Sequence, residues 1–221
     1  MKTELKLAHD VQVSLMPTEH PKLEGFDIAG LSIPAQEVGG DHYDYARISN
    51  DASKFGISVF DVSGKGMQAA MSAVFTSGAF ASEVKLSSSA AEILTRLNQS
   101  VYSHSKRGHF VAFLLGVLDI PSKVLTFANA GQTKPLLKSN GSVQWLDSVG
   151  VTFHLGMKDD SLYGERTLQL YSGDVLLFLT DGFTEAMNAS REQFGAENME
   201  RLMRRLEANS LSSQQIVERI R

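Results

Sequence analysis

The stretch Phe55-Gly56-Ile57-Ser58-Val59-Phe60-Asp61-Val62-Ser63-Gly64-Lys65-Gly66 does most to decide the fold. Its first half is a short apolar run that ends in turn residues, which is the pattern of a buried strand. Asp61 is therefore expected where that strand leaves the core, and the glycines beyond it let backbone or ligand come close. An acidic side chain in that position is a candidate for binding chemistry.

Two more aspartates stand in similar surroundings. Asp181 follows the apolar run 175–179 and precedes Gly182, and Asp41 follows Gly39-Gly40. Asp and Gly also dominate ordinary turns, so each pair alone has a purely structural explanation. Carboxylate oxygens are also the ligands that hard cations prefer. The pattern leaves two alternatives open: three separate turns, or one site for Mg²⁺ or Mn²⁺.

The composition is that of an ordinary globular protein. The chain has 221 residues, 43% of them hydrophobic, and a net charge of −4, which gives no reason to expect binding to nucleic acid or to an anionic membrane. The absence of cysteine excludes disulfides, thiolate metal sites and cysteine nucleophiles. No apolar stretch approaches the roughly 20 residues that span a bilayer, and the N-terminus lacks the apolar core of a secretion signal. We therefore expect a cytoplasmic location.

Hydrophobic periodicity predicts one α+β domain, residues 18–221, behind an N-terminal linker or switch segment, residues 1–17. That segment contains a helix at 3–16 that Pro17 ends, and one broad face of it carries Leu5, Ala8, Val11, Gln12 and Leu15. Asn140-Gly141 predicts a tight hairpin turn. Further helices are expected at 67–84, after the capping box that begins at Ser89, around 199–206, and after Ser212. Strands are expected at 26–33, 43–48, 55–60, 110–118, 124–128, 135–138, 143–146, 166–170 and 175–179, the last two joined as a hairpin.

Three familiar catalytic motifs fail at single positions. A phosphate-binding P-loop would need glycine at position 59 and Ser or Thr at position 66, where Val59 and Gly66 stand. A nucleophile elbow around Ser63 would need glycine in place of Asp61. The signature of haloacid dehalogenase-like phosphatases would need its nucleophile where Leu179 stands. These three kinds of chemistry are therefore excluded.

Five segments occur in order along the chain. They are Pro34-Ala35-Gln36-Glu37-Val38-Gly39-Gly40-Asp41-His42-Tyr43-Asp44, Asp61-Val62-Ser63-Gly64-Lys65-Gly66, Gly116-Val117-Leu118-Asp119, Ala128-Asn129-Ala130-Gly131 and Thr180-Asp181-Gly182-Phe183-Thr184-Glu185-Ala186. Together they resemble the motifs of bacterial PPM-type (protein phosphatase 2C-like) serine phosphatases, the sigma-factor regulator or stage II sporulation E-like group. The run from Glu4 to Pro17 is similar to the helix that precedes their catalytic domain. The match extends from about residue 4 to the end of the chain.

The resemblance implies an αββα sandwich, in which two antiparallel sheets pack face to face between helices. It also implies a dinuclear Mn²⁺ or Mg²⁺ site at one edge, with Asp41, Asp61 and Asp181 as catalytic residues. Asp61 would bridge both metals, the Val62 carbonyl would help bind one of them, Asp181 would bind the other, and Asp41 would act directly or through a metal-bound water. Two cations about 4 Å apart lower the pKa of a shared water, which can attack phosphoserine without a covalent enzyme intermediate.

The chain departs from the family pattern in three places. The family usually continues to a final strand with an Asp-Asp pair, and this chain ends at Arg221 without one. We therefore expect a C-terminally truncated domain. Its metal site would be one carboxylate short and weakly occupied by metal. Gln132 stands where the family often has histidine. The segment Val151-Thr152-Phe153-His154-Leu155-Gly156 replaces a loop richer in proline.

The resemblance further implies the substrate and the partners. The substrate would be a phosphorylated STAS-domain anti-sigma-factor antagonist. The N-terminal helix would join the domain to an upstream sensor or receiver domain, and would form a homodimer. The preferred metal and the activating signal stay open, as does the general acid, for which His42 and Lys65 are the sequence's candidates.

Two other functions remain as alternatives. A catalytically degenerate phosphatase fold would bind partners without turnover. A nucleotide cyclase is indicated by Gly39-Gly40-Asp41-His42-Tyr43, which is similar to the Gly-Gly-Asp-Glu-Phe motif of diguanylate cyclases, but His42 replaces the acid that this chemistry needs.

Overall fold

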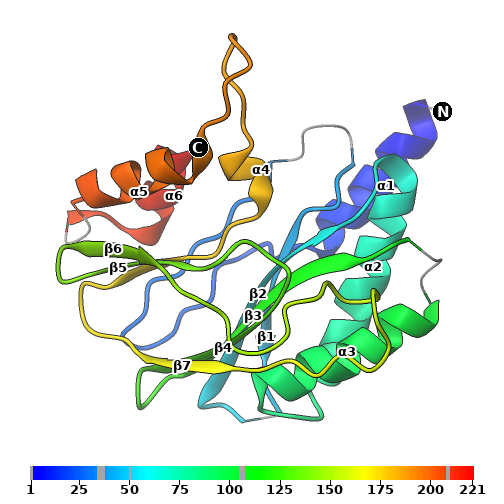
Figure 1. The fold of residues 1–221 in the computed structure, drawn as a ribbon, viewed down its shortest axis with the longest axis horizontal. Coiled ribbons are helices and arrows are strands. Elements are labelled where there is room, and N and C mark those ends of the chain that lie inside the picture. The colour runs from blue at the N-terminus through cyan, green and yellow to red at the C-terminus, as the bar shows by residue number, and fades with distance from the viewer. Residues whose placement is uncertain (1, 34–37, 50, 105–107, 208–209) are drawn as a thin grey trace.

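The computed structural model describes residues 2–33, 38–49, 51–104, 108–207 and 210–221, with the backbone alone for residues 2–8. The expected residues 34–37 of the first acidic motif lie outside this set. The larger of two antiparallel sheets has the order β1-β2-β3-β4-β7 and the smaller has the order β6-β5-β8 (Figure 1). The strands are β1 (His42–Arg47), β2 (Lys54–Val62), β3 (Val111–Asp119), β4 (Val124–Ala130), β5 (Leu136–Ser139), β6 (Ser142–Trp145), β7 (Arg166–Gln169) and β8 (Val175–Leu177).

Helices cover the outer faces of both sheets (Figure 1). The two outer layers and the space between the sheets each hold an apolar cluster: Phe60 and Phe113 pack under α2 and α3, Leu114 and Leu137 lie between the sheets, and Met203 packs against the smaller sheet. This is the expected αββα sandwich. The helices are α1 (Lys2–Leu15), α2 (Gly66–Glu83), α3 (Ala90–His104), α4 (Asp181–Thr184), α5 (Gly195–Arg205) and α6 (Ser213–Ile220).

Local sequence signals explain several boundaries. Asn140 and Gly141 both have positive φ, 48° and 79°, as a primed two-residue hairpin turn requires, and they join β5 to β6. At the start of α6, Ser212 and Gln215 form the expected capping box. At α3 only half of the predicted box forms, since the Ser89 hydroxyl accepts from the Glu92 N–H at 3.1 Å while the Glu92 carboxylate accepts from Ser87 instead.

Two strand predictions are wrong. Residues 27–33 pair with no strand, because they cross the side chains of β1: a Cβ at Gly30 would lie 2.6 Å from the ring of Tyr43. The strands near residues 166–170 and 175–179 form, but not as a hairpin. β7 pairs with β4 and β8 pairs with β5, so the turn between them passes from one sheet to the other. Both strands direct leucines into the space between the sheets, and alternation alone does not distinguish the two arrangements.

Candidate metal centre

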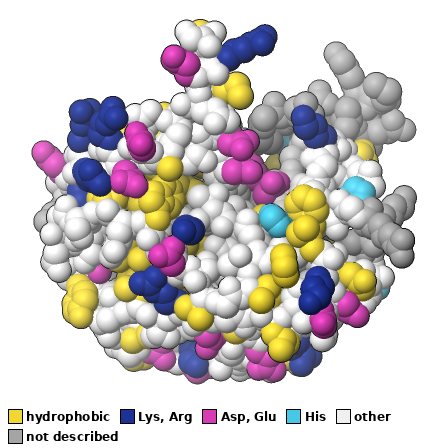
Figure 2. Space-filling model, viewed as in Figure 1, with side chains coloured by type: hydrophobic (Ala, Val, Ile, Leu, Met, Phe, Trp, Pro, Cys, Tyr) yellow, Lys and Arg dark blue, Asp and Glu magenta, His cyan; other side chains and the backbone are white. Residues whose placement is uncertain are grey.

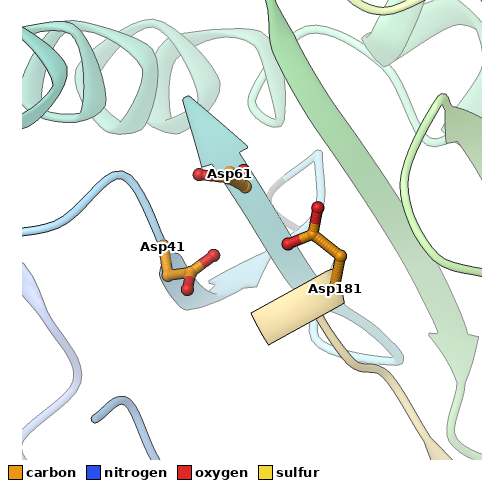
Figure 3. Close-up of side chains that lie close together, drawn as sticks. All are labelled: Asp41, Asp61 and Asp181. Carbon is orange, nitrogen blue, oxygen red and sulfur yellow. The ribbon is translucent and has the colours of Figure 1, made fainter. Parts of the chain in front are cut away.

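Three carboxylates from distant parts of the chain meet at one edge of the sandwich. Asp41 directly precedes β1, Asp61 is the penultimate residue of β2, and Asp181 begins α4; their side chains point toward one another (Figure 3). One oxygen of each lies within 4.8 Å of the others. The prediction that these three residues lie close together is therefore confirmed.

The alternation of β2 explains the orientation of Asp61. Its neighbours Phe60 and Val62 are buried under the helices α2 and α3, so Asp61 points to the opposite face. Gly40 permits the close approach of the Asp41 segment, because a Cβ there would lie 2.5 Å from the Val62 carbonyl oxygen and 2.6 Å from Asp61 Oδ1. The Val62 carbonyl thus faces the same small space as the carboxylates.

Asp181 reaches the cluster from the second sheet. Its strand, β8, ends at Leu177, and the buried Leu179 continues the extended path before α4 begins. The backbone N–H of Glu185 donates to the Asp181 carbonyl at 2.8 Å and closes the single turn of α4. The sequence predicts a strand that ends at residue 179. The observed strand ends at Leu177, and Asp181 stands four residues later at the start of α4.

The electrostatics of the cluster favour a cation. Burial and the nearby carboxylates of Asp41 and Asp181 raise the pKa of Asp61 to about 7, and Glu185 adds a smaller contribution in the same direction. Burial also raises the pKa of Asp41. Its Oδ1 is buried without a hydrogen-bond partner among the described residues, and no ion pair described in the structure involves the three aspartates. An all-oxygen donor set with mutual repulsion fits Mg²⁺ or Mn²⁺.

This repulsion predicts a pH dependence of stability in protein freed of divalent cations by a chelator. The folded-state pKa of Asp61, about 7, exceeds its ordinary value of 3.8, so its contribution to stability is fully present below pH 4 and is lost as pH rises through 7. Asp61→Asn should remove this loss. We therefore expect the thermal midpoint of the variant to rise relative to wild type between pH 4 and pH 8. A difference that stays constant with pH would contradict this prediction.

The two candidates for a general acid lie elsewhere. His42 is 3% exposed and its ring packs on Phe60 with centroids 4.9 Å apart, so it points into the core under α2 and away from Asp61. Burial lowers its pKa to about 4. His42 therefore faces away from the three carboxylates, because adjacent residues of an extended chain face opposite sides. Lys65 is exposed and precedes α2, at the rim of a cavity that Asp41 also lines.

Sequence reasoning did not identify the function of Gln12. Its side chain is 4% exposed, and its amide makes two hydrogen bonds to Gly39: Nε2 donates to the Gly39 carbonyl at 2.6 Å, and Oε1 accepts from the Gly39 N–H at 3.3 Å. Gly39 is two residues before Asp41. A polar residue on the apolar side of a helix was the signal available in the sequence.

Comparison with known proteins agrees with the geometry. The family model of stage II sporulation protein E (SpoIIE) matches residues 51–221, which is most of the chain. This chain belongs to the SpoIIE family. The family and the αββα sandwich together identify the chain as a relative of the protein phosphatase 2C-type serine phosphatases. The nucleotide cyclase alternative therefore no longer applies.

Among curated proteins, this SpoIIE-family member is similar to the phosphoserine phosphatase RsbU of Bacillus subtilis, with 27% identity over 185 residues. The match covers 84% of this chain and 54% of RsbU. The chain thus spans about half the length of that relative. Among solved structures it resembles the SiaA-PP2C domain of Pseudomonas aeruginosa, with a TM-score of 0.78 and 24% identity over 99% of this chain and 85% of that one. RsbX, solved in complex with magnesium, has a TM-score of 0.60 and 19% identity over 86% of this chain and 82% of its own.

Figure 2 shows acidic side chains gathered on the surface in the region of α4, with hydrophobic side chains beside them.

Among the described residues, no helix is both long and apolar enough to cross a membrane.

Proposed function

We propose that this chain is a Mn²⁺- or Mg²⁺-dependent serine/threonine protein phosphatase that hydrolyses phosphoserine on a regulatory protein. The observation that supports it most is the cluster of Asp41, Asp61 and Asp181, three carboxylates that come from three elements and lie within 4.8 Å. The similarity to RsbU, a phosphoserine phosphatase, supports the substrate class. From the resemblance of the chain's motifs to the sigma-factor regulator group, the proposed phosphoprotein is a STAS-domain anti-sigma-factor antagonist.

The proposed centre consists of groups from three parts of the chain. Asp41, Asp61, Asp181 and the Val62 carbonyl would hold the metal. When bound, a divalent cation neutralises phosphoryl charge and lowers the pKa of a coordinated water. The chain's own residues supply the positioning: Gly40 keeps the Asp41 segment against Val62, and α4 carries Asp181 across from the smaller sheet. Asp181 is exposed, so the centre is open to a protein substrate.

The N-terminal segment 1–17 is proposed as a linker that reports on an upstream sensor or receiver domain. Its helix α1 packs against α2, and Gln12 fixes the backbone of Gly39 beside the acidic cluster. The exposed apolar side chains Val11, Val13 and Leu15 support a homodimer through the same helix. A movement of α1 would therefore be transmitted to Asp41.

Gln12→Ala tests this connection. Loss of both hydrogen bonds to Gly39 should loosen the Asp41 segment and weaken Mn²⁺ binding by about tenfold, the lower end of the range for groups that orient metal ligands. Calorimetric titration with Mn²⁺ measures it. Ser14→Ala, which removes an exposed hydroxyl from the same helix, is the control and should bind Mn²⁺ as wild type does. Equal affinities of the two variants would contradict a link through Gln12.

The proposed activity is tested by phosphate release from a phosphoserine-containing STAS-domain protein, with and without Mn²⁺ or Mg²⁺. The proposal requires release that depends on the metal and stops with a chelator. Binding of the phosphoprotein that is independent of metal, with no release at any metal concentration, would favour a degenerate phosphatase fold that acts by binding alone.

A further inference from the structure

A histidine lies across the sheet from Asp61. Asp61 stands opposite Ala112 in the pairing of β2 with β3. On the other side of β3, Val111 and Leu155 exchange two backbone hydrogen bonds of 3.0 and 2.9 Å as an antiparallel bridge. That bridge brings His154 level with Ala112, so Asp61, Ala112 and His154 occupy one row. Two strand spacings separate the backbone of His154 from that of Asp61, about 10 Å.

The side chains of this row share one face of the sheet. His154 packs on Phe110, with ring centroids 4.8 Å apart, and Phe110 has the same alternation as Ala112. Ala112 is the one residue in the interior of β3 that is not buried. In this row, therefore, the side chain between Asp61 and His154 is the single methyl group of Ala112.

Packing fixes the imidazole of His154 and leaves its nitrogens available. A Cβ at Gly131 would lie 2.8 Å from three atoms of the ring, Nε2 among them, so the ring rests directly on the Gly131 backbone. None of the hydrogen bonds described for residues 2–33, 38–49, 51–104, 108–207 and 210–221 involves the imidazole nitrogens. Burial lowers the pKa of His154, so the ring is neutral near pH 7, with one nitrogen as donor and one as acceptor.

The segment on both sides of His154 is anchored from the helical layer. The Tyr163 hydroxyl donates to the Phe153 carbonyl at 2.9 Å. The fully buried Asn98 accepts from the Gly156 N–H at 2.9 Å and donates to the carbonyls of Lys158 and Asp159. A functional side chain needs such support to keep its geometry. The structure therefore holds His154 in place more firmly than an ordinary surface loop would.

We propose that His154 is a substrate-binding residue whose ring N–H donates a hydrogen bond to an oxygen of the phosphoserine group lying over Ala112. The inference rests on the proposed phosphatase function and extends it. In the proposed phosphoserine-binding site, the three carboxylates lie on one side and the imidazole of His154 on the other. In that row the methyl group of Ala112 is the side chain between Asp61 and His154, and the imidazole itself covers Gly131.

The test compares His154→Ala, His154→Gln and the control His104→Ala, an exposed histidine on α3. With a phosphoserine peptide and saturating Mn²⁺, His154→Ala should lower kcat/KM about tenfold to a hundredfold, as expected for a lost hydrogen bond to a charged group, chiefly through KM. His154→Gln keeps a donor and should recover part of the loss. Mn²⁺ affinity and thermal midpoint should match those of His104→Ala.

A second readout does not depend on turnover. Calorimetry with inorganic phosphate and Mn²⁺-loaded protein should show binding that His154→Ala weakens by a similar factor. If wild type hydrolyses the peptide and His154→Ala behaves as His104→Ala in both assays, the inference is overturned and the proposed function stands. If wild type binds phosphate through His154 but releases none from the peptide, the proposed function fails and the inference stands. Absence of phosphate binding overturns the inference.

Discussion

Asp61→Asn is expected to abolish metal-dependent phosphate release. One oxygen of Asp61 lies within 4.8 Å of oxygens of Asp41 and Asp181, and the charges of both raise its pKa, so its carboxylate interacts with both other members of the cluster. Loss of a group that merely orients a metal ligand costs about ten- to a hundredfold in metal affinity or activity, and loss of a ligand should exceed that. The measurement is the rate of phosphate release from the STAS-domain phosphoprotein across a range of Mn²⁺ concentrations.

Asp181→Asn should behave in the same way. Asp160→Asn is the matched control, because Asp160 is exposed and pairs with Lys158. It should keep wild-type activity. Where Asp160→Asn is active, a residual rate in Asp61→Asn close to it would exclude Asp61 from the proposed centre.

Gly40→Ala is expected to have the next largest effect. The added methyl group would lie 2.5 Å from the Val62 carbonyl oxygen and 2.6 Å from Asp61 Oδ1, and the first of these contacts is with backbone that has little freedom to move. Overpacking of this kind costs typically about 1–3 kcal/mol, and here the strain falls on two of the proposed metal-binding oxygens. We expect Mn²⁺ affinity to fall by about tenfold or more, as measured by calorimetry.

Gly182→Ala is the comparison that isolates the steric effect. Gly182 also adjoins the cluster, but an added Cβ there would be 3.4 Å from its nearest neighbour, Asp41 Oδ2, an ordinary contact. This variant should retain most of the Mn²⁺ affinity. If both alanine variants lose affinity equally, the close approach of Gly40 to Val62 is not what shapes the site.

Much of the fold was predictable from local patterns. Apolar runs, the capping box at Ser212 and the Asn140-Gly141 turn fix their elements by physics that acts over a few residues. The errors arose where distant packing decides. The strands β7 and β8 carry a hairpin-like pattern, yet each pairs in a different sheet, and the leucines that both supply to the space between the sheets fit either arrangement.

The site shows the same division. Residue type and position singled out Asp41, Asp61 and Asp181, but their convergence depends on how two sheets pack, which no local pattern contains. His42 attracted attention by its neighbour in sequence and proved to face the core. His154 has no acidic neighbour in its motif, and only the bridge between Val111 and Leu155 brings it level with Asp61. Register across strands supplied the information that adjacency along the chain did not.

The crossing from β8 to α4 has a consequence for folding kinetics. Asp41 and Asp61 belong to the larger sheet, whereas Asp181 is delivered by a strand of the smaller one, so the three oxygens assemble only after the two sheets have docked. A cation that binds the assembled set recognises the native state alone, and at a hundredfold excess over its Kd it adds about 2.7 kcal/mol of stability. Since docking of the sheets brings together residues as far apart in sequence as Asp41 and Asp181, this gain would come late on the pathway. Mn²⁺ would then slow unfolding and leave the refolding rate almost unchanged.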